Sequence, residues 1–278
     1  MNHLPENHSG ARTDRQLIDL WLSGRPESTQ LVYEPVVLDF LKHCQAGLQE
    51  CTVQDLAKWA EQLQGRDATR FRKVSTIKSL FRYGYRTGYL AFDVGLPIKG
   101  AKPFDKLHEK ILDVDSVHEV IRQARQGRDR ILIRCLYATG GRVSEVCKMR
   151  YRDLVGNRIS FFGKGRKTRV VMIPDSLAQE LLSLRTRECL PDSPIFRSHR
   201  GQGLLPRNAR QIIAQAGDDA LLHLSPHYLR HSHASHALDA GAPIHLVAQC
   251  LGHANISTTS RYLHARPSDG SSRFLNLG

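Results

Sequence analysis

The sequence predicts a mainly α-helical protein, built from a small all-helical domain and a larger, mostly helical domain that contains a small antiparallel β-sheet. Three observations predict it. Apolar residues recur at helical spacing through most of the chain, often behind a capping residue. A stretch rich in Gly, Pro and Lys interrupts this pattern at 93–110. Strand-like alternation is confined to the segment NRISFFGKGRKTRVVMIP.

Composition bounds the class of protein. The 278 residues are enough to bury two modest cores, and 40 Lys and Arg against 27 Asp and Glu give a net charge of +13, which favours a polyanionic partner. No apolar run approaches the roughly 20 residues that span a bilayer, and the first residues lack the pattern of a signal peptide. The six cysteines form no C-x-x-C pair. We therefore expect a cytoplasmic, nucleoid-associated protein with reduced thiols.

The first domain is predicted at 13–92, after a flexible tail at 1–12. A T-x-x-Q capping box at 13–16 opens its first helix, and a T-x-x-D box at 52–55 opens its third. The second helix begins near residue 29, where Pro35 is expected to kink or shorten it. A fourth helix covers about 67–87. With no convincing strand, this domain is predicted to be all-helical.

Basic residues concentrate on the fourth helix and on the segment after it. Ten basic residues stand against three acidic ones between positions 66 and 106, interleaved with aromatic residues. A solvated helix face is the alternative interpretation, but a helix that is apolar on one side and cationic on the other favours DNA binding. The residues predicted to contact DNA phosphates here are Arg70, Lys73, Lys78, Arg82, Lys99, Lys102 and Lys106.

The second domain is predicted at 111–266, between a basic linker at 93–110 and a C-terminal tail at 267–278. Two short strands at 159–162 and 169–173 are joined by a GKGRK turn. The remaining elements are helices at 115–126, 129–139, from 142 onward, 176–187, 206–216, 226–239, 243–251 and 257–263.

Histidines are abundant near the C-terminus, with eight of the fourteen from residue 223 onward. His227 and His231 have the i, i+4 spacing of two zinc ligands on one helix face, but Tyr228 occupies the position of the glutamate in H-E-x-x-H. The glycine-rich runs at 140–142 and 163–167 do not match a P-loop. We therefore expect no metal and no nucleotide cofactor.

A different chemistry fits the polar motifs better. Over 120 residues the chain contains TGGRVSE, GKGRK, HYLRH, LGH and a late tyrosine, in that order. In a transesterification at a phosphodiester, arginines stabilise the charge that builds up on the phosphate oxygens. Histidine and lysine are suited to take the proton of the attacking hydroxyl and to protonate the leaving oxygen.

This order of motifs strongly resembles the tyrosine recombinase, or phage integrase, family, and within it the Xer-like members. The resemblance covers about residues 13–266. It implies a SAM-like core-binding domain followed by a catalytic domain with the DNA breaking-rejoining fold. It also implies a site-specific recombinase that works through a 3′-phosphotyrosine and a Holliday junction, as a homotetramer on two sites in double-stranded DNA, without a cofactor. Whether a second recombinase shares the tetramer stays open.

The resemblance also implies roles for individual residues. Arg142 and Arg230 correspond to the phosphate-binding arginines, with Glu145 as a supporting acid, and Tyr262 corresponds to the nucleophile. The other positions carried over are His227 as acid/base, His253 as the second phosphate-bonding histidine and Lys164 as the mobile general acid. Arg166, in the same basic turn, is predicted to bind DNA. Lys167 is the alternative general acid.

Alternative roles and functions are also open. Arg142 could cap helix carbonyls, Tyr262 could be an ordinary core residue, and His231, His233 and His236 are expected to pack or to contact the DNA backbone. Among functions, a type IB topoisomerase shares the same constellation of side chains, and a non-catalytic DNA-binding protein could retain the scaffold. The H-x-x-R and LGH motifs, together with the small helical first domain, favour the recombinase.

Overall fold

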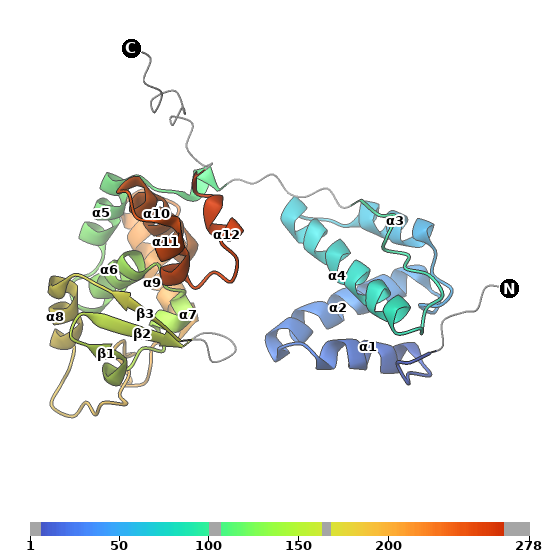
Figure 1. The fold of residues 1–278 in the computed structure, drawn as a ribbon, viewed down its shortest axis with the longest axis horizontal. Coiled ribbons are helices and arrows are strands. Elements are labelled where there is room, and N and C mark those ends of the chain that lie inside the picture. Colours follow the sequence, from blue (N-terminus) through green and yellow to red (C-terminus); the bar gives the residue numbers. More distant parts are fainter. Residues whose placement is uncertain (1–6, 100–106, 163–167, 264–278) are drawn as a thin grey trace, which may run out of the picture. The chain divides into compact units, whose positions relative to one another are not determined.

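The computed structural model of the chain describes residues 7–99, 107–162 and 168–263. It divides into two compact units, Met1–Asp105 and Lys106–Gly278, shown in Figure 1. Each unit has its own hydrophobic core. Across the described part of the chain, no helix is long and apolar enough to cross a membrane.

Unit 1 is a bundle of helices around an aromatic core. Its helices are α1 (Asp14–Ser23), α2 (Glu27–Cys44), α3 (Val53–Gln62) and α4 (Asp67–Arg86). The ring of Phe40 on α2 lies at the centre, in edge contact with Trp59 of α3 at 5.3 Å and with Phe81 of α4 at 5.7 Å between centroids. Such edge-to-face pairs add to the stabilisation that comes from burying the rings.

Capping explains where two of these helices begin. The Thr13 side chain accepts a hydrogen bond from the Gln16 backbone at the start of α1, and Thr52 and Asp55 form a reciprocal capping box at the start of α3. Pro35 lies inside α2 without ending it, and the helix runs for 18 residues. Phe40 and its neighbours on the core face of α2 are buried, and this tertiary packing offsets the hydrogen bond lost at the proline.

The chain continues to pack on unit 1 after α4. Val94 is 5% exposed and belongs to the unit 1 core, and partly buried Ile98 packs against the same core. The Lys78 ammonium donates a hydrogen bond to the Ile98 carbonyl, and Asp93 forms an ion pair with Arg82 at 3.7 Å. The range expected as a linker, 93–110, therefore includes residues that belong to this core.

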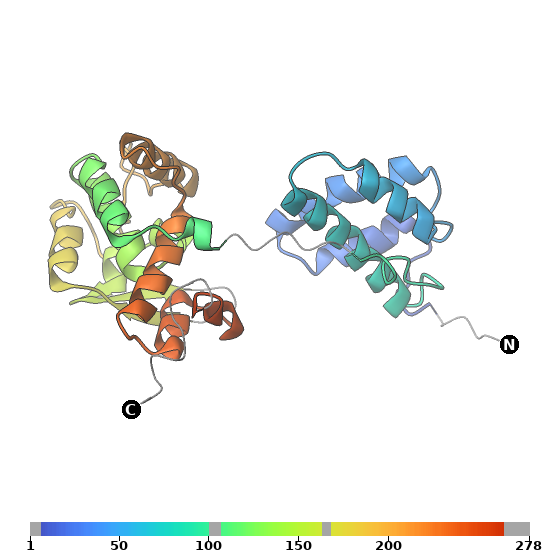
Figure 2. The same cartoon turned by 90° about the horizontal axis from the view of Figure 1, so that it is seen from above.

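Unit 2 combines helices with one small sheet (Figures 1 and 2). The helices are α5 (Val114–Gln123), α6 (Arg128–Thr139), α7 (Val143–Val146), α8 (Asp175–Ser183), α9 (Pro206–Asp219), α10 (Pro226–Asp239), α11 (Ile244–Leu251) and α12 (Ser257–Ser260), with 3-10 turns η1 (His108–Lys110) and η2 (Tyr151–Asp153). Helix α6 is central and packs against α5, α8 and α10. The expected fold class, mainly α with a small antiparallel sheet, is confirmed.

The sheet has three antiparallel strands in the order β1 (Leu154–Val155), β2 (Arg158–Phe162) and β3 (Thr168–Met172). Ile159 pairs with Val171, and both side chains point into the core. The two longer strands begin one residue earlier than the sequence indicated, and β1 was not predicted because two residues carry no periodic signal. The GKGRK turn between β2 and β3 lies outside the described residues.

Candidate active site

The turn between α6 and α7 places the first arginine of the site. Helix α6 ends at Gly140, which has a left-handed φ of +57°. A Cβ at this position would lie 2.6 Å from His233 Cδ2 and 2.7 Å from Leu251 Cδ2, so no other residue fits without moving neighbouring side chains. The tight turn lets the chain reverse at once into α7, with Arg142 as its N-cap residue.

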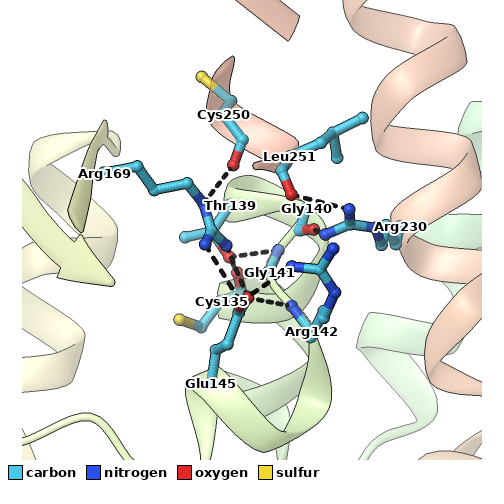
Figure 3. Close-up of polar contacts among 10 residues, drawn as sticks. All are labelled: Cys135, Thr139, Gly140, Gly141, Arg142, Glu145, Arg169, Arg230, Cys250 and Leu251. Atoms are coloured by element: carbon cyan, nitrogen blue, oxygen red, sulfur yellow. Dashed lines mark hydrogen bonds and ion pairs between the residues drawn. The ribbon is translucent and has the colours of Figure 1, made fainter. Parts of the chain in front are cut away.

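Arg142 is held by Glu145 on the first turn of α7 (Figure 3). The Arg142 backbone N–H donates to Glu145 Oε2 at 2.9 Å, and its Nη1 donates to Oε1 at 3.0 Å. The Arg142 side chain is 45% exposed whereas that of Glu145 is only 10% exposed. The carboxylate therefore orients a guanidinium that still faces solvent, which argues against a role for Arg142 as a buried helix cap.

Arg169 on β3 completes this cluster. The sequence motifs did not identify it as a site residue. Its Nη2 and Nη1 donate to Glu145 Oε2 and Oε1 at 2.6 and 3.1 Å, and its Nε donates to the Cys250 carbonyl at 2.8 Å. Burial alone would raise the pKa of Glu145, but hydrogen bonds from Arg169 and Arg142 lower it to about 2. Strand alternation, which puts Arg169 on the same face as buried Val171, is the sequence signal that could have found it.

Arg230 on α10 is the second predicted phosphate-binding arginine and is 6% exposed. Its Nη1 donates to the Gly140 carbonyl at 2.7 Å and its Nη2 to the Leu251 carbonyl at 2.8 Å (Figure 3). Burial, followed by repulsion from Arg142, lowers its pKa to about 10, so it stays charged at neutral pH. The two bonds use two of the five guanidinium donors and fix the plane of the group.

Two predicted histidines lie in the field of these arginines. His227 stands one turn before Arg230 on α10, and burial, then the charge of Arg230, lowers its pKa. His253 follows Gly252, the left-handed residue that ends α11. Its Nδ1 lies 2.8 Å from the buried Thr259 hydroxyl, and burial with the charges of Arg230 and Arg142 lowers its pKa to about 4.

Tyr262, the predicted nucleophile, lies just beyond α12. It is 4% exposed and packs in a small apolar cluster with Leu107, Ala234, Val247 and Leu251. Its hydroxyl lies 2.8 Å from Nδ1 of His231 on α10. Burial raises the pKa of Tyr262, and the nearby charge of Arg230 opposes that shift. The tyrosine is thus buried, as a core residue would be, but its hydroxyl faces the polar side of α10.

A cleft of about 1450 Å³ opens beside the Arg142–Glu145–Arg169 cluster in unit 2. Both Arg142 and His253 line it, so two of the predicted phosphate-binding groups border an accessible space. Further cationic residues extend along its wall. These are Lys148, Arg150 and Arg152.

The predicted DNA-binding residues on α4 all have partners within unit 1, and for Lys78 the partner is the Ile98 carbonyl. Arg70 pairs with Asp67 at 2.7 Å, Lys73 with Asp39 at 4.0 Å and Arg82 with Asp93 at 3.7 Å, and the three basic side chains are 31–58% exposed. Lys99 is exposed. Lys102, Lys106, Lys164 and Arg166, together with the alternative acid Lys167, lie outside the described residues.

Comparisons with known proteins find one family in both the family model and the related sequences. Residues 109–269 match the family model described as the phage integrase family. The tyrosine recombinase XerC of Thermodesulfovibrio yellowstonii is 30% identical over 221 aligned positions, and the alignment covers 73% of this chain and 73% of that protein. The tyrosine recombinase XerD of Rickettsia bellii is 31% identical over 285 aligned positions, 90% of this chain and 92% of that protein.

Solved structures show the same fold. A lambda integrase dimer bound to a COC′ core site aligns over 95% of this chain and 79% of its own, with a TM-score of 0.76 at 18% identity. The XerH site-specific recombinase bound to a palindromic difH substrate aligns over 91% of this chain and 82% of its own, with a TM-score of 0.74 at 22% identity.

Proposed function

The chain belongs to the phage integrase family and is a tyrosine-type, Xer-like site-specific recombinase, and from this premise we propose that it cuts and rejoins DNA through a 3′-phosphotyrosine formed on Tyr262. In this proposal Arg142, Arg230 and His253 bind the scissile phosphate, His227 exchanges the proton of the nucleophile, and Glu145 orients Arg142. The helical domain at 13–92 binds the core DNA site, and the domain at 111–266 carries the chemistry.

One observation carries this proposal: fixed positive charge converges on the imidazoles and on the tyrosine hydroxyl. Arg142 and Arg230 reach the same turn from different elements, and their charges contribute to the lowered pKa values of His227 and His253. In the described residues of this cluster, Glu145 supplies a carboxylate, and Arg142 and Arg169 already pair with it. A site with this excess of cations is preorganised for an anion whose charge increases in the transition state.

The steps of the proposed reaction are assigned to these groups. The Tyr262 oxygen attacks phosphorus and its O–H bond breaks, while the bond from phosphorus to the 5′ oxygen of the DNA breaks. His227, which is neutral at neutral pH because its pKa is lowered, accepts the tyrosine proton. Lys164, or alternatively Lys167, gives a proton to the 5′ oxygen. Attack by a 5′ hydroxyl of a second strand reverses these steps, and the bond energy kept in the phosphotyrosine makes ATP unnecessary.

The hydrogen bond of His253 suits it to bind phosphate. If the Thr259 hydroxyl donates to Nδ1, the neutral ring carries its proton on Nε2. That N–H is then available to a non-bridging phosphate oxygen. The buried Thr259 hydroxyl holds the orientation of the ring, as outer hydrogen-bond partners do for histidine ligands in metal sites.

Contacts to the DNA backbone are assigned to the basic residues outside the active site. Exposed ion pairs such as that of Arg70 with Asp67 contribute about 0–1 kcal/mol, so a phosphate can replace the carboxylate at little cost. The residues proposed to make these contacts are Arg70, Lys73, Lys78, Arg82, Lys99, Lys102, Lys106 and Arg166.

The proposed assembly is a homotetramer that joins two target sites in double-stranded DNA through a Holliday junction. It is supported by the structural neighbour described as a lambda integrase tetramer bound to a Holliday junction, which has a TM-score of 0.75 and is 18% identical to this chain. Its place of action is the nucleoid, in the cytoplasm.

Trapping the covalent intermediate tests the proposed function. Fragments of the source genome are incubated with the protein, covalent adducts are captured, and nicked substrates are then made from the recovered site. The wild-type protein and Tyr228→Phe should form the adduct, because Tyr228 packs against the core of unit 2. Tyr262→Phe should bind the same DNA without forming it, because only the attacking oxygen is lost. An adduct on Tyr262→Phe would reject the assignment.

A further inference from the structure

His231 contacts the atom that the proposed reaction uses as its nucleophile. Its Nδ1 lies 2.8 Å from the Tyr262 hydroxyl, and the two ring centroids are 5.7 Å apart with a 45° tilt. The other ring neighbour of His231 is His227, at 6.2 Å and close to parallel. His231 therefore contacts both the ring of the histidine assigned to proton transfer and the tyrosine assigned to attack, although its sequence position predicted only packing or contact with the DNA backbone.

The two partners differ in how firmly the fold holds them. His231 directly follows Arg230 on α10, a helix of 14 residues that is anchored to the Gly140 and Leu251 carbonyls. Tyr262 follows α12, a helix of only four residues. So short a helix has little stability of its own, and side-chain contacts must define where the tyrosine oxygen lies. The apolar cluster packs around the ring, but a hydrogen bond is needed to orient the hydroxyl.

The protonation state of His231 allows its Nδ1 to accept this hydrogen bond. Burial, with His227 and the cations Lys110, Arg230 and Arg261, lowers the pKa of His231 to about 4. The ring is therefore neutral at neutral pH. A neutral ring with its proton on Nε2 offers Nδ1 as an acceptor, and the phenol, which is still protonated, donates to it. In this direction the bond directs the O–H toward the histidine and leaves the oxygen lone pairs for attack.

We propose that His231 is a positioning residue for the nucleophile, whose Nδ1 accepts the hydrogen bond of the Tyr262 hydroxyl and holds its oxygen for attack on the scissile phosphate. This role rests on the proposed function, because it presupposes that Tyr262 attacks DNA. The role requires an acceptor at the position of Nδ1, and it does not require the imidazole to take the proton.

Substitutions that keep or remove the acceptor test the role. Asparagine places its amide oxygen near the position of Nδ1, whereas alanine offers no acceptor. A matched control exists on the same helix, where His236 Nδ1 lies 2.7 Å from the Tyr137 hydroxyl. The variants are therefore His231→Asn, His231→Ala and His236→Asn. Single-turnover adduct formation on the nicked substrate, DNA binding and thermal unfolding are measured for each of them and for the full-length wild-type protein.

We expect His231→Ala to bind DNA with unchanged affinity but to form the adduct about tenfold or more slowly, the effect of losing a hydrogen bond that orients the nucleophile. His231→Asn should recover the wild-type rate to within about threefold because it keeps an acceptor. His236→Asn should cleave like the wild type.

Three outcomes would overturn the proposal. His231→Ala could form the adduct as fast as the wild type, or faster, which would mean that the hydrogen bond does not help attack. His231→Asn, folded and bound to DNA, could be as slow as His231→Ala, which would make the imidazole a proton acceptor rather than a positioning group. His236→Asn could lose as much activity as His231→Ala, which would make the effect one of helix packing. If the wild-type protein itself forms no adduct, the proposed function fails and not this role.

Discussion

At the scale of single residues, the two arginines proposed to bind phosphate are held in different ways. Arg142 is exposed and forms an ion pair with Glu145. Glu145 also pairs with Arg169, so its carboxylate keeps a partner when Arg142 is removed. Arg230 is buried, and it donates hydrogen bonds to two backbone carbonyls that belong to different elements. The same chemical role therefore carries different structural consequences, which mutation can separate.

We predict that Arg142→Ala and Arg230→Ala each slow adduct formation by roughly 10²-fold or more, since each removes donors to the developing phosphate charge. Arg142→Ala should leave Tm nearly unchanged. Arg230→Ala should also lower Tm, because the Gly140 and Leu251 carbonyls lose their buried donor. Cleavage assays and thermal unfolding of both variants check this. Equal losses of Tm, or cleavage at the wild-type rate by Arg142→Ala, would contradict it.

Buried histidines make stability depend on pH. The pKa values of His231, His233 and His253 are lowered to about 4, mainly by burial. Unfolded histidines titrate near 6.5, so between pH 6.5 and 4 the unfolded chain binds protons that the folded chain does not. The free energy of unfolding should therefore fall as pH falls through this window.

Denaturant unfolding of the DNA-free protein at pH 7 and at pH 4.5 measures this loss. His253→Asn should reduce the difference between the two pH values, because it removes one of the contributing groups. A free energy of unfolding that is constant or rises on acidification through this window would show that the imidazoles are not held neutral.

At the scale of elements, Glu145 joins three parts of unit 2. Through Arg169 it links α7 to β3, and the Arg169 Nε bond to the Cys250 carbonyl extends the connection to α11. Both charged side chains are about nine-tenths buried. Breaking a buried pair leaves one charge without a partner, which costs more than the pair itself contributes.

Arg169→Ala should therefore destabilise the protein by about 3–5 kcal/mol, and Arg169→Lys should recover only part of this because lysine cannot donate two parallel hydrogen bonds. Arg150→Ala is the matched control. Its ion pair with Asp192 is exposed and 3.7 Å long, so its loss should cost about 0–1 kcal/mol. Urea denaturation compares the three variants. If Arg169→Ala proved as stable as Arg150→Ala, the pair would have no structural role.

Local signals in the sequence predicted most of the helices and all the motif residues. Capping boxes marked α1 and α3, and the motif order led to Arg142, Glu145 and Tyr262. The Glu145–Arg169 pair was not predicted, because it depends on how β3 returns along the site after two intervening strands. The His231–Tyr262 contact was not predicted either, because it depends on how α12 packs against α10. Both are tertiary contacts: strand alternation indicates that Arg169 shares a face with buried Val171, but no local pattern indicates which residue it pairs with.

At the scale of the whole molecule, the basic residues and the motif residues are divided between the two units. The net charge of +13 favours any polyanion, but the motif residues all lie in unit 2 and the basic helix α4 lies in unit 1. We therefore assign binding to the DNA backbone mainly to unit 1 and the reaction at the phosphate to unit 2. They should respond to different mutations.

Replacing Lys99, Lys102 and Lys106 together by Ala should weaken binding to specific and random DNA alike. It should also reduce the slope of log K against log salt by about two to three, because each phosphate contact contributes about 0.9. The corresponding triple arginine variant keeps the charge and should keep the slope. An unchanged slope in the alanine variant would place these lysines away from the DNA backbone.

The most direct test of the central claim is to identify the bond between protein and DNA. The trapped adduct is digested with protease and nuclease, and mass spectrometry locates the nucleotide-bearing residue and the end of the DNA strand that it carries. We predict a 3′-phosphate linked to the oxygen of Tyr262 and a free 5′ hydroxyl on the other side of the break. A nucleotide on any other residue, or a 5′-phosphate linkage, would contradict it.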